Sequence, residues 1–104
     1  MAIYKNEGRW DASNVLSDGK WVLRYEKGGR DPQLDSIDYG ATALRRDVVA
    51  ALASGEPSGL DAVQTDLAKR KRLRAVLARE RFYEIGSSEG LADLDRHLRA
   101  RANS

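Results

Sequence analysis

Cysteine is absent from this 104-residue chain, which has a single histidine and only two prolines. The absence of cysteine excludes disulfide bonds, thiolate catalysis and zinc sites that use sulfur ligands. The longest apolar run, residues 48–53, is far too short to cross a bilayer, and the first residues lack the apolar stretch of a signal peptide. We therefore expect a cytoplasmic protein with no membrane partner. The length predicts a single domain over residues 1–104.

The net positive charge is small and unevenly distributed along the chain. The net charge is only +2 at pH 7, which is a mild basic bias and not the large excess of a protein that coats nucleic acid. Residues 1–57 carry a net charge of −1, whereas residues 58–104 carry +3. Any anionic partner is therefore expected at the C-terminal half.

Residues 58–85 show the strongest helical pattern in the chain. They are rich in Ala, Leu, Arg, Lys and Glu, which favour helix, and they lack proline. Ser58 and Asp61, directly after Pro57, resemble a short capping box. We predict that this is the longest helix. Core positions expected on this helix and on the last one are Leu60, Val63, Leu67, Val76, Leu77, Leu91, Leu94 and Leu98.

Residues 1–27 predict a small antiparallel β-meander. Turn residues follow a β-prone run at residues 2–5, and Asp18-Gly19 lies between two further β-prone runs, which is typical of a hairpin. Alternation along the last strand places Trp21, Leu23 and Tyr25 on one face, which we expect to face the core.

The order of these strands resembles a known DNA-binding arrangement. The stretches IYKNEGRW at residues 3–10 and GKWVLRYEKGG at residues 19–29 are similar to the three-stranded arm-binding domains at the N-termini of tyrosine recombinases. The resemblance is confined to these residues, includes no diagnostic motif and does not assign the chain to that family. It implies a three-stranded sheet in this region.

Residues 28–104 are predicted to be largely helical. One or two helical turns are expected near residues 32–40, a helix at residues 42–54 ended by Gly55, the long helix, and a last helix from Ser87 or Ser88 to Ala102. The fold class is therefore α+β, a β-meander followed by about three helices. The alternative is a mainly helical domain with an appended hairpin.

The residues that usually carry catalysis do not form a recognisable pattern. His97 lies near Asp93 on the last predicted helix, which is typical of a surface histidine beside a carboxylate. The acidic residues lack the spacing of a metal site, and Gly28-Gly29 lacks the lysine and hydroxyl residue of a phosphate loop. We expect no enzyme activity, catalytic residue, metal or cofactor.

A dense run of cations is the main functional signal. Five cations within six residues, on what is predicted to be a rigid helix, are able to neutralise several phosphates. The alternative is an ordinary solvated helix whose positive charges are neutralised by acidic residues such as Asp66 and Glu80. The predicted nucleic-acid-binding residues are Lys69, Arg70, Lys71, Arg72, Arg74 and Arg79.

The aromatic residues allow a second interpretation. Interleaved with cations on a sheet, they are able to stack on bases, but in so small a domain they more often form the core. The set comprises Tyr4, Trp10, Trp21, Tyr25, Phe82 and Tyr83.

We therefore expect a small, non-enzymatic, regulatory protein that binds DNA or RNA phosphates through a basic helix. The alternative is a protein-binding adaptor or inhibitor, of a mobile element for example, that acts through its sheet face or an apolar helix stripe. In that case the partner is another protein or a second copy of the chain.

Overall fold

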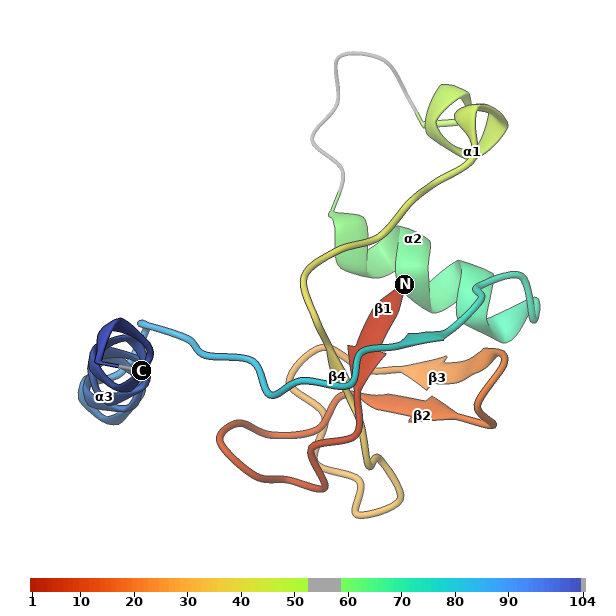
Figure 1. The fold of residues 1–104 in the computed structure, drawn as a ribbon. Coiled ribbons are helices and arrows are strands. Elements are labelled where there is room, and N and C mark those ends of the chain that lie inside the picture. The colour runs from red at the N-terminus through yellow and green to blue at the C-terminus, as the bar shows by residue number, and fades with distance from the viewer. Residues whose placement is uncertain (53–58, 104) are drawn as a thin grey trace.

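The computed structural model of the chain describes residues 1–52 and 59–103, and its architecture is α+β (Figure 1). The predicted fold class is confirmed, with short strands in the N-terminal part and helices after them. In the described ranges, no helix is long and apolar enough to cross a membrane. The elements in chain order are β1 (Ala2–Tyr4), β2 (Val15–Ser17), β3 (Val22–Tyr25), β4 (Ile37–Asp38), α1 (Arg46–Ala50), α2 (Leu60–Lys69), β5 (Val76–Leu77) and α3 (Ser88–Ala102).

β1 is the central strand of a three-stranded sheet. β4 pairs with it antiparallel, with Tyr4 opposite Ile37, and β5 pairs with it in parallel, with Ile3 opposite Leu77. β2 and β3 form a separate two-stranded hairpin. The predicted meander over residues 1–27 is therefore wrong. The three-stranded sheet that the recombinase resemblance implied does not form either.

The loop after β1 explains why β1 does not pair with β2. Asn6 is fully buried, and its side-chain amide donates to the carbonyls of Arg9 and Asp11 at 3.1 and 2.8 Å. The Ser13 hydroxyl donates to Asn6 Oδ1 at 2.7 Å, which closes the loop on itself. The chain therefore folds back without forming a hairpin, and β4 occupies the edge of β1 instead.

The predicted Asp18-Gly19 hairpin is present between β2 and β3. Gly19 has a φ of 93°, in the left-handed region that glycine adopts without strain. Asp18 Oδ1 accepts hydrogen bonds from the amides of Lys20 and Trp21 at 2.9 and 2.7 Å. The turn is therefore specified by local residues.

The face of β3 that points to the core differs from the prediction. Tyr25 is buried as expected, but Trp21 and Leu23 are only half-buried, whereas Val22 is fully buried. A register shift in the pairing with β2, between Leu16 and the next residue, breaks the simple alternation on which the prediction relied.

The hydrophobic core lies between α2 and the two sheets. α2 packs on β3 through Leu67 and Ala68, and the buried Gln64 on the same helix accepts a hydrogen bond from the Thr42 hydroxyl at 2.9 Å. The core thus joins α2 to β1, β2 and β3 and to the segment that leads into β5. Its buried side chains are Met1, Ile3, Val15, Val22, Tyr25, Leu67, Ala68, Leu73 and Ala75.

The helix predicted over residues 58–85 ends at Lys69. After a turn the chain runs extended, and the amides of Val76 and Ala78 donate to the carbonyls of Met1 and Ile3 at 2.9 and 2.7 Å. The intrinsic helix preference of this stretch is therefore overridden by pairing with β1. The longest helix is α3, with 15 residues, and not the element at residues 58–85.

Two other predicted helices are shorter or absent. The turn or two expected at residues 32–40 does not form, because Ile37 and Asp38 pair with β1 as β4. The helix expected at residues 42–54 is only the five-residue α1. The predicted signals at Gly55, Pro57 and Ser58 lie outside the described residues, and α2 has Gly59 at its N-cap.

α3 begins where it was predicted to begin. Ser87 is its N-cap, and its hydroxyl accepts a hydrogen bond from the Gly90 amide at 3.0 Å. Figure 1 shows α3 set apart from the sheets, at the end of the extended segment that follows β5.

Several positions that the sequence predicted to lie in the core are exposed to solvent. Leu67 is buried, and Val63 and Leu94 are half-buried. The prediction fails where α2 begins, on β5 and on part of α3, because no other element in residues 1–52 and 59–103 covers those side chains. The exposed positions are Leu60, Val76, Leu77, Leu91 and Leu98.

Candidate nucleic-acid interface

All six predicted phosphate-binding side chains are exposed, but they do not lie on a continuous helix. Lys69 is the last residue of α2 and Arg70 is its C-cap. The other four follow the helix: Lys71 and Arg72 form the turn, Arg74 makes a bridge to Trp21, and Arg79 comes after β5. The residues predicted to form one basic helix therefore lie at the end of α2, in the turn that follows it and along the extended segment that contains β5.

The turn after α2 has a fixed backbone. The Arg72 amide donates to the Leu67 carbonyl at 2.9 Å, and the Lys71 amide donates to the Ala68 carbonyl at 3.1 Å. These two bonds define a Schellman motif, with Lys71 in the left-handed position that is usually occupied by glycine. Lys71 has a φ of 55°. We call residues 69–74 the cationic turn.

The last part of the cationic turn is held on both sides. The Leu73 carbonyl accepts from the Val22 amide at 2.8 Å, and the Ala75 amide donates to the Lys20 carbonyl at 2.9 Å. Leu73 and Ala75 are buried, so Arg72 and Arg74, which alternate with them, point to solvent. Two guanidinium groups are thus presented from a hydrogen-bonded backbone.

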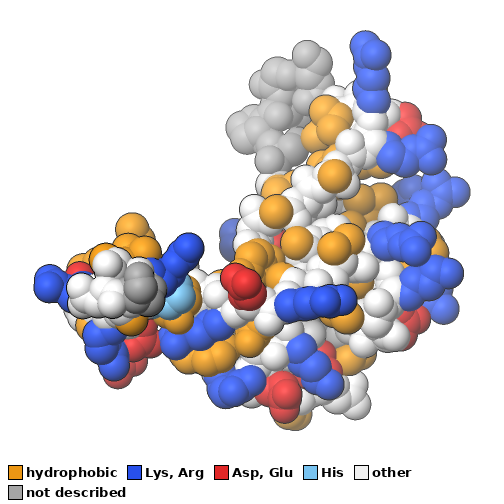
Figure 2. Space-filling view, in the orientation of Figure 1, with side chains coloured by type: hydrophobic (Ala, Val, Ile, Leu, Met, Phe, Trp, Pro, Cys, Tyr) orange, Lys and Arg blue, Asp and Glu red, His pale blue; other side chains and the backbone are white. Residues whose placement is uncertain are grey.

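A groove of about 720 Å³ between α1 and α2 is bordered by the cationic turn. Its lining includes apolar side chains that pack on the core, among them Leu44, Val48 and Val63. Figure 2 shows Lys and Arg side chains gathered on the right of the view, over the part of the molecule where α1 and the end of α2 lie. The cations that line the groove are Arg45, Arg70, Lys71, Arg72 and Arg74.

The structure thus brings together four of the six predicted residues and adds one. Arg45, just before α1, was missed, because nothing in the local sequence indicates that it approaches a turn so distant along the chain. Lys69 and Arg79 are exposed, but they do not line the groove.

Two of the cations that line the groove form ion pairs with acidic residues. Arg70 pairs with Asp66 and Arg45 pairs with Asp47, each at 3.2 Å and on exposed side chains, so both pairs are weak. In the described part of the chain, no ion pair within 4.0 Å involves Lys71, Arg72 or Arg74. The groove therefore has an excess of positive charge.

The negative charge of Asp18 partly offsets the excess positive charge of the groove near Lys71. The amides of Trp21 and Lys20 donate to its carboxylate, and these bonds, with a smaller contribution from the positive charge of Lys71, lower the pKa of Asp18 below its usual value. Asp18 is thus ionised at neutral pH and close enough to Lys71 to feel its charge.

The predicted aromatic set does not form one stacking platform. Tyr25 is in the core, while Tyr4 and Phe82 each contact Trp10, Tyr39 and one another at ring-centroid distances of 6.0 to 6.4 Å. Only Trp21 lies at the groove, with the Arg74 guanidinium 5.8 Å from its ring centroid. It is the one predicted aromatic residue placed to stack on a base beside the cations.

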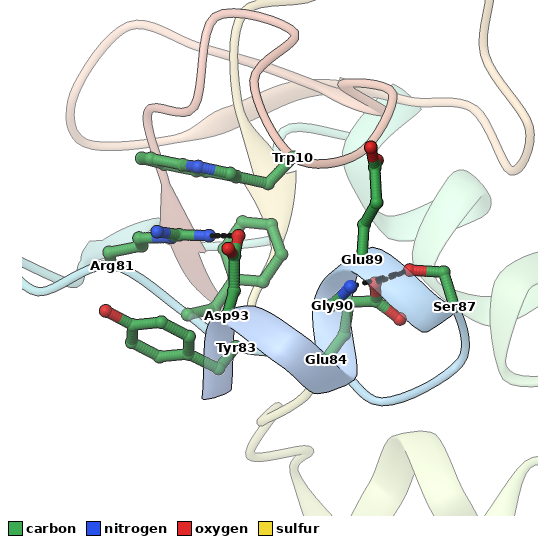
Figure 3. A pocket seen from close by; sticks show the side chains of 9 residues that line it. Trp10, Arg81, Tyr83, Glu84, Ser87, Glu89, Gly90 and Asp93 are labelled. Atoms are coloured by element: carbon green, nitrogen blue, oxygen red, sulfur yellow. Dashed lines mark hydrogen bonds and ion pairs between the residues drawn. The ribbon is translucent and has the colours of Figure 1, made fainter. Parts of the chain in front are cut away.

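A second, smaller hollow of about 70 Å³ lies where α3 meets the rest of the protein (Figure 3). The Arg81 guanidinium lies between two rings, 4.1 Å from the centroid of Trp10 and 4.5 Å from that of Tyr83. Tyr83 stacks in turn on His97 of α3 at 4.4 Å. His97, predicted to be a surface residue beside a carboxylate, is thus half-buried in a stack of four side chains.

Asp93 completes this contact from α3. Its carboxylate accepts from Arg81 at 2.7 Å and also pairs with Arg96. The bond from Arg81 is the main cause that lowers the pKa of Asp93 below its usual value, and Arg96 adds to it. These contacts hold α3 in place, although the buried Arg81 Nε has no hydrogen-bond partner in the described part of the chain. In the described ranges, no three acidic or histidine side chains are grouped as metal ligands would be.

Comparison with known proteins adds no assignment. The chain matches no protein-family model, no curated protein and no solved structure.

Proposed function

We propose that the protein is a small regulatory module that binds nucleic acid, with the phosphate backbone held by the cationic turn at the border of the groove between α1 and α2. The observation that carries this proposal is a run of exposed cations on a backbone that is fixed by hydrogen bonds, and several of these cations form no ion pair with the residues that the structure describes.

The fixed backbone favours binding in a specific way. An anion-binding segment that is flexible must lose conformational freedom when it binds, and this loss reduces the affinity. Here the Schellman bonds and the bonds to Val22 and Lys20 already order residues 70–75. Only the long side chains of Lys71, Arg72 and Arg74 remain to be ordered, because the chain that carries them is in place.

Trp21 gives the interface a second type of contact. Stacking on an aromatic ring contributes about 1–3 kcal/mol per base and tolerates any base sequence. A phosphate on Arg74 brings the adjoining nucleotide near the Trp21 ring, because the guanidinium is 5.8 Å from its centroid. We therefore expect single-stranded nucleic acid to bind more tightly than a duplex of the same length.

The test is the salt dependence of binding to random-sequence nucleic acid. The slope of log affinity against log salt has a magnitude of about 0.9 per duplex phosphate contact. The double variant Lys71→Ala/Arg72→Ala should reduce this magnitude by about 1.8 on a duplex and by about 1.4 on a single strand, where each contact contributes about 0.7, and it should weaken binding to all sequences alike.

Lys27→Ala/Arg30→Ala is the matched control. It removes one lysine and one arginine that are also exposed but do not line the groove. It should leave the slope close to that of the wild type. Equal losses in both double variants would mean that only net charge matters, and an unchanged slope in the first would exclude the cationic turn.

The groove also favours a second candidate, a protein-binding adaptor. Its lining combines Leu44, Val48 and Val63 with the bordering cations, which suits an acidic segment with apolar side chains. Under this alternative, nucleic-acid binding is weak and does not respond to Lys71→Ala/Arg72→Ala, whereas Val48→Asp releases the partner.

A further inference from the structure

The groove between α1 and α2 has an apolar interior and a cationic border. Leu44, Val48 and Val63 are half-buried and pack against the core, whereas the five cations of the lining are exposed. Figure 2 shows hydrophobic side chains beside the gathered Lys and Arg side chains over this part of the molecule. The two acidic lining residues, Asp47 and Asp66, are each held in an ion pair. The lining therefore carries a net charge of +3 next to an apolar surface.

Neutral hydrogen-bonding side chains are nearly absent from the lining. Of the lining residues that the structure describes, only Trp21 has such a side chain, with its indole N–H, and the others are apolar or charged. A sugar or a nucleoside inside the groove would bury several neutral polar groups, which are costly to bury without partners. The lining thus suits a ligand that places an apolar body inside the groove and a single anionic group at its border.

The size of the groove suits a small ligand. Its volume of about 720 Å³ lies within the range of about 300–1,000 Å³ that is typical of small-molecule sites. One apolar wall is provided by α1, whose five residues extend about 7.5 Å along the helix axis. An alkyl chain of medium length is enough to cover this wall.

We propose that the groove binds a free anionic amphiphile of the medium-chain fatty-acid type. The alkyl chain lies on the apolar side chains of α1 and α2, and the carboxylate is held at the border by Lys71 and Arg72. In the described part of the chain neither cation forms an ion pair, so the carboxylate does not have to displace an acidic residue. Hydrogen bonds between such cations and a carboxylate are stronger than those between neutral groups.

The ligand and a nucleic-acid phosphate would use the same cations. If the carboxylate occupies Lys71 and Arg72, a phosphate is excluded from them, and the amphiphile acts as a competitive inhibitor of nucleic-acid binding. This consequence rests on the proposed function, whereas binding of the ligand itself does not.

Isothermal titration calorimetry at neutral pH, below the micelle concentrations, tests the two parts of the ligand separately. Decanoate should bind at a one-to-one ratio. Octanoate, with two fewer methylenes, should bind about 4–15-fold more weakly, because each methylene that is half to fully buried contributes about two- to fourfold. Decan-1-ol, which lacks the charge, should bind at least about tenfold more weakly than decanoate. No binding of decanoate, or equal affinities for decanoate and either of the other compounds, would overturn the proposal.

Two neighbouring valines of α1 provide a matched pair of variants. Val48 lines the groove, whereas Val49 is 50% exposed and does not line it. Val48→Gln should weaken decanoate binding by at least about fivefold, because it places a polar amide against the alkyl chain, and Val49→Gln should leave binding unchanged. Leu52→Gln, at a lining position that is 39% exposed, replaces Val48→Gln if that variant does not fold. Equal effects inside and outside the groove would overturn the proposal.

Fluorescence anisotropy of a labelled random-sequence single strand tests the competition. Saturating decanoate should raise the dissociation constant of the nucleic acid by about tenfold or more in the wild type, and by much less in Val48→Gln at the same decanoate concentration. A wild type that binds both ligands at once with unchanged affinities would overturn the competition. Because the calorimetric titrations contain no nucleic acid, a protein that binds decanoate but no nucleic acid would refute the proposed function alone.

Discussion

Replacing Lys71 by glycine should make the protein more stable, which is unusual for a glycine substitution. Lys71 holds a φ of 55°, where a non-glycine residue costs roughly 1–2 kcal/mol. Glycine removes this cost, but it adds about 0.4–1 kcal/mol of conformational entropy to the unfolded chain. The net gain therefore lies between about 0 and 1.6 kcal/mol, and its central value of about 0.8 kcal/mol raises the Tm by about 3–6 °C in a domain of this size.

Lys69→Gly is the matched control, because it removes the same charge two residues earlier. Lys69 is the last residue of α2 and has helical geometry, so glycine there should reduce the free energy of unfolding by about 0.5–1 kcal/mol. Thermal unfolding followed by circular dichroism measures both changes. Equal destabilisation by the two variants would show that the helix continues through Lys71 and would refute the turn.

Two further predictions concern packing and pH. Leu67→Ala, at a position that is 9% exposed, should lower the free energy of unfolding by about 2–5 kcal/mol in urea titrations, whereas Leu91→Ala should change it by less than about 0.5 kcal/mol; similar losses would contradict the core described here. The pKa of Asp93 is lower in the folded protein than its usual 3.8, so its stabilising contact with Arg81 is complete above that pH and is lost as the pH falls through the folded value. Trp10 fluorescence in a Trp21→Phe background should report this acid transition, and Asp93→Asn should abolish it.

The features that the sequence predicted correctly are those that neighbouring residues determine. The hairpin at Asp18-Gly19 forms because the aspartate caps the turn and the glycine accepts its left-handed backbone. The start of α3 is specified by Ser87 in the same local manner. Exposure of the cations could also be predicted, because unpaired lysine and arginine side chains are rarely buried.

The end of α2 could not be predicted in this way. The usual local stop signal is a glycine in the left-handed position, and here that position is a lysine. The residues after it favour helix, yet the Val76 amide pairs with the carbonyl of Met1, 75 positions earlier in the chain. A long-range backbone pairing thus outweighed local propensity, and it moved Val76 and Leu77 from predicted core to exposed strand.

The composition of the groove depends on the same kind of distant contact. Arg45 and Trp21 line the same groove as the cationic turn only because Val48 of α1 packs against the core and because Trp21 bridges to Arg74. Neither contact has a local signature. The sequence therefore indicated which cations are exposed, but not which surface they share.

Lysine acetylation, measured by mass spectrometry with and without random-sequence nucleic acid, tests most directly whether the cationic turn holds phosphates. The chain contains five lysines, so each can be followed separately. Bound phosphates should protect Lys71 most, since it lines the groove, while Lys5 and Lys27 should react as fast as in the free protein. Protection of Lys5 and Lys27 with Lys71 unprotected would place the nucleic acid elsewhere and contradict the proposed interface.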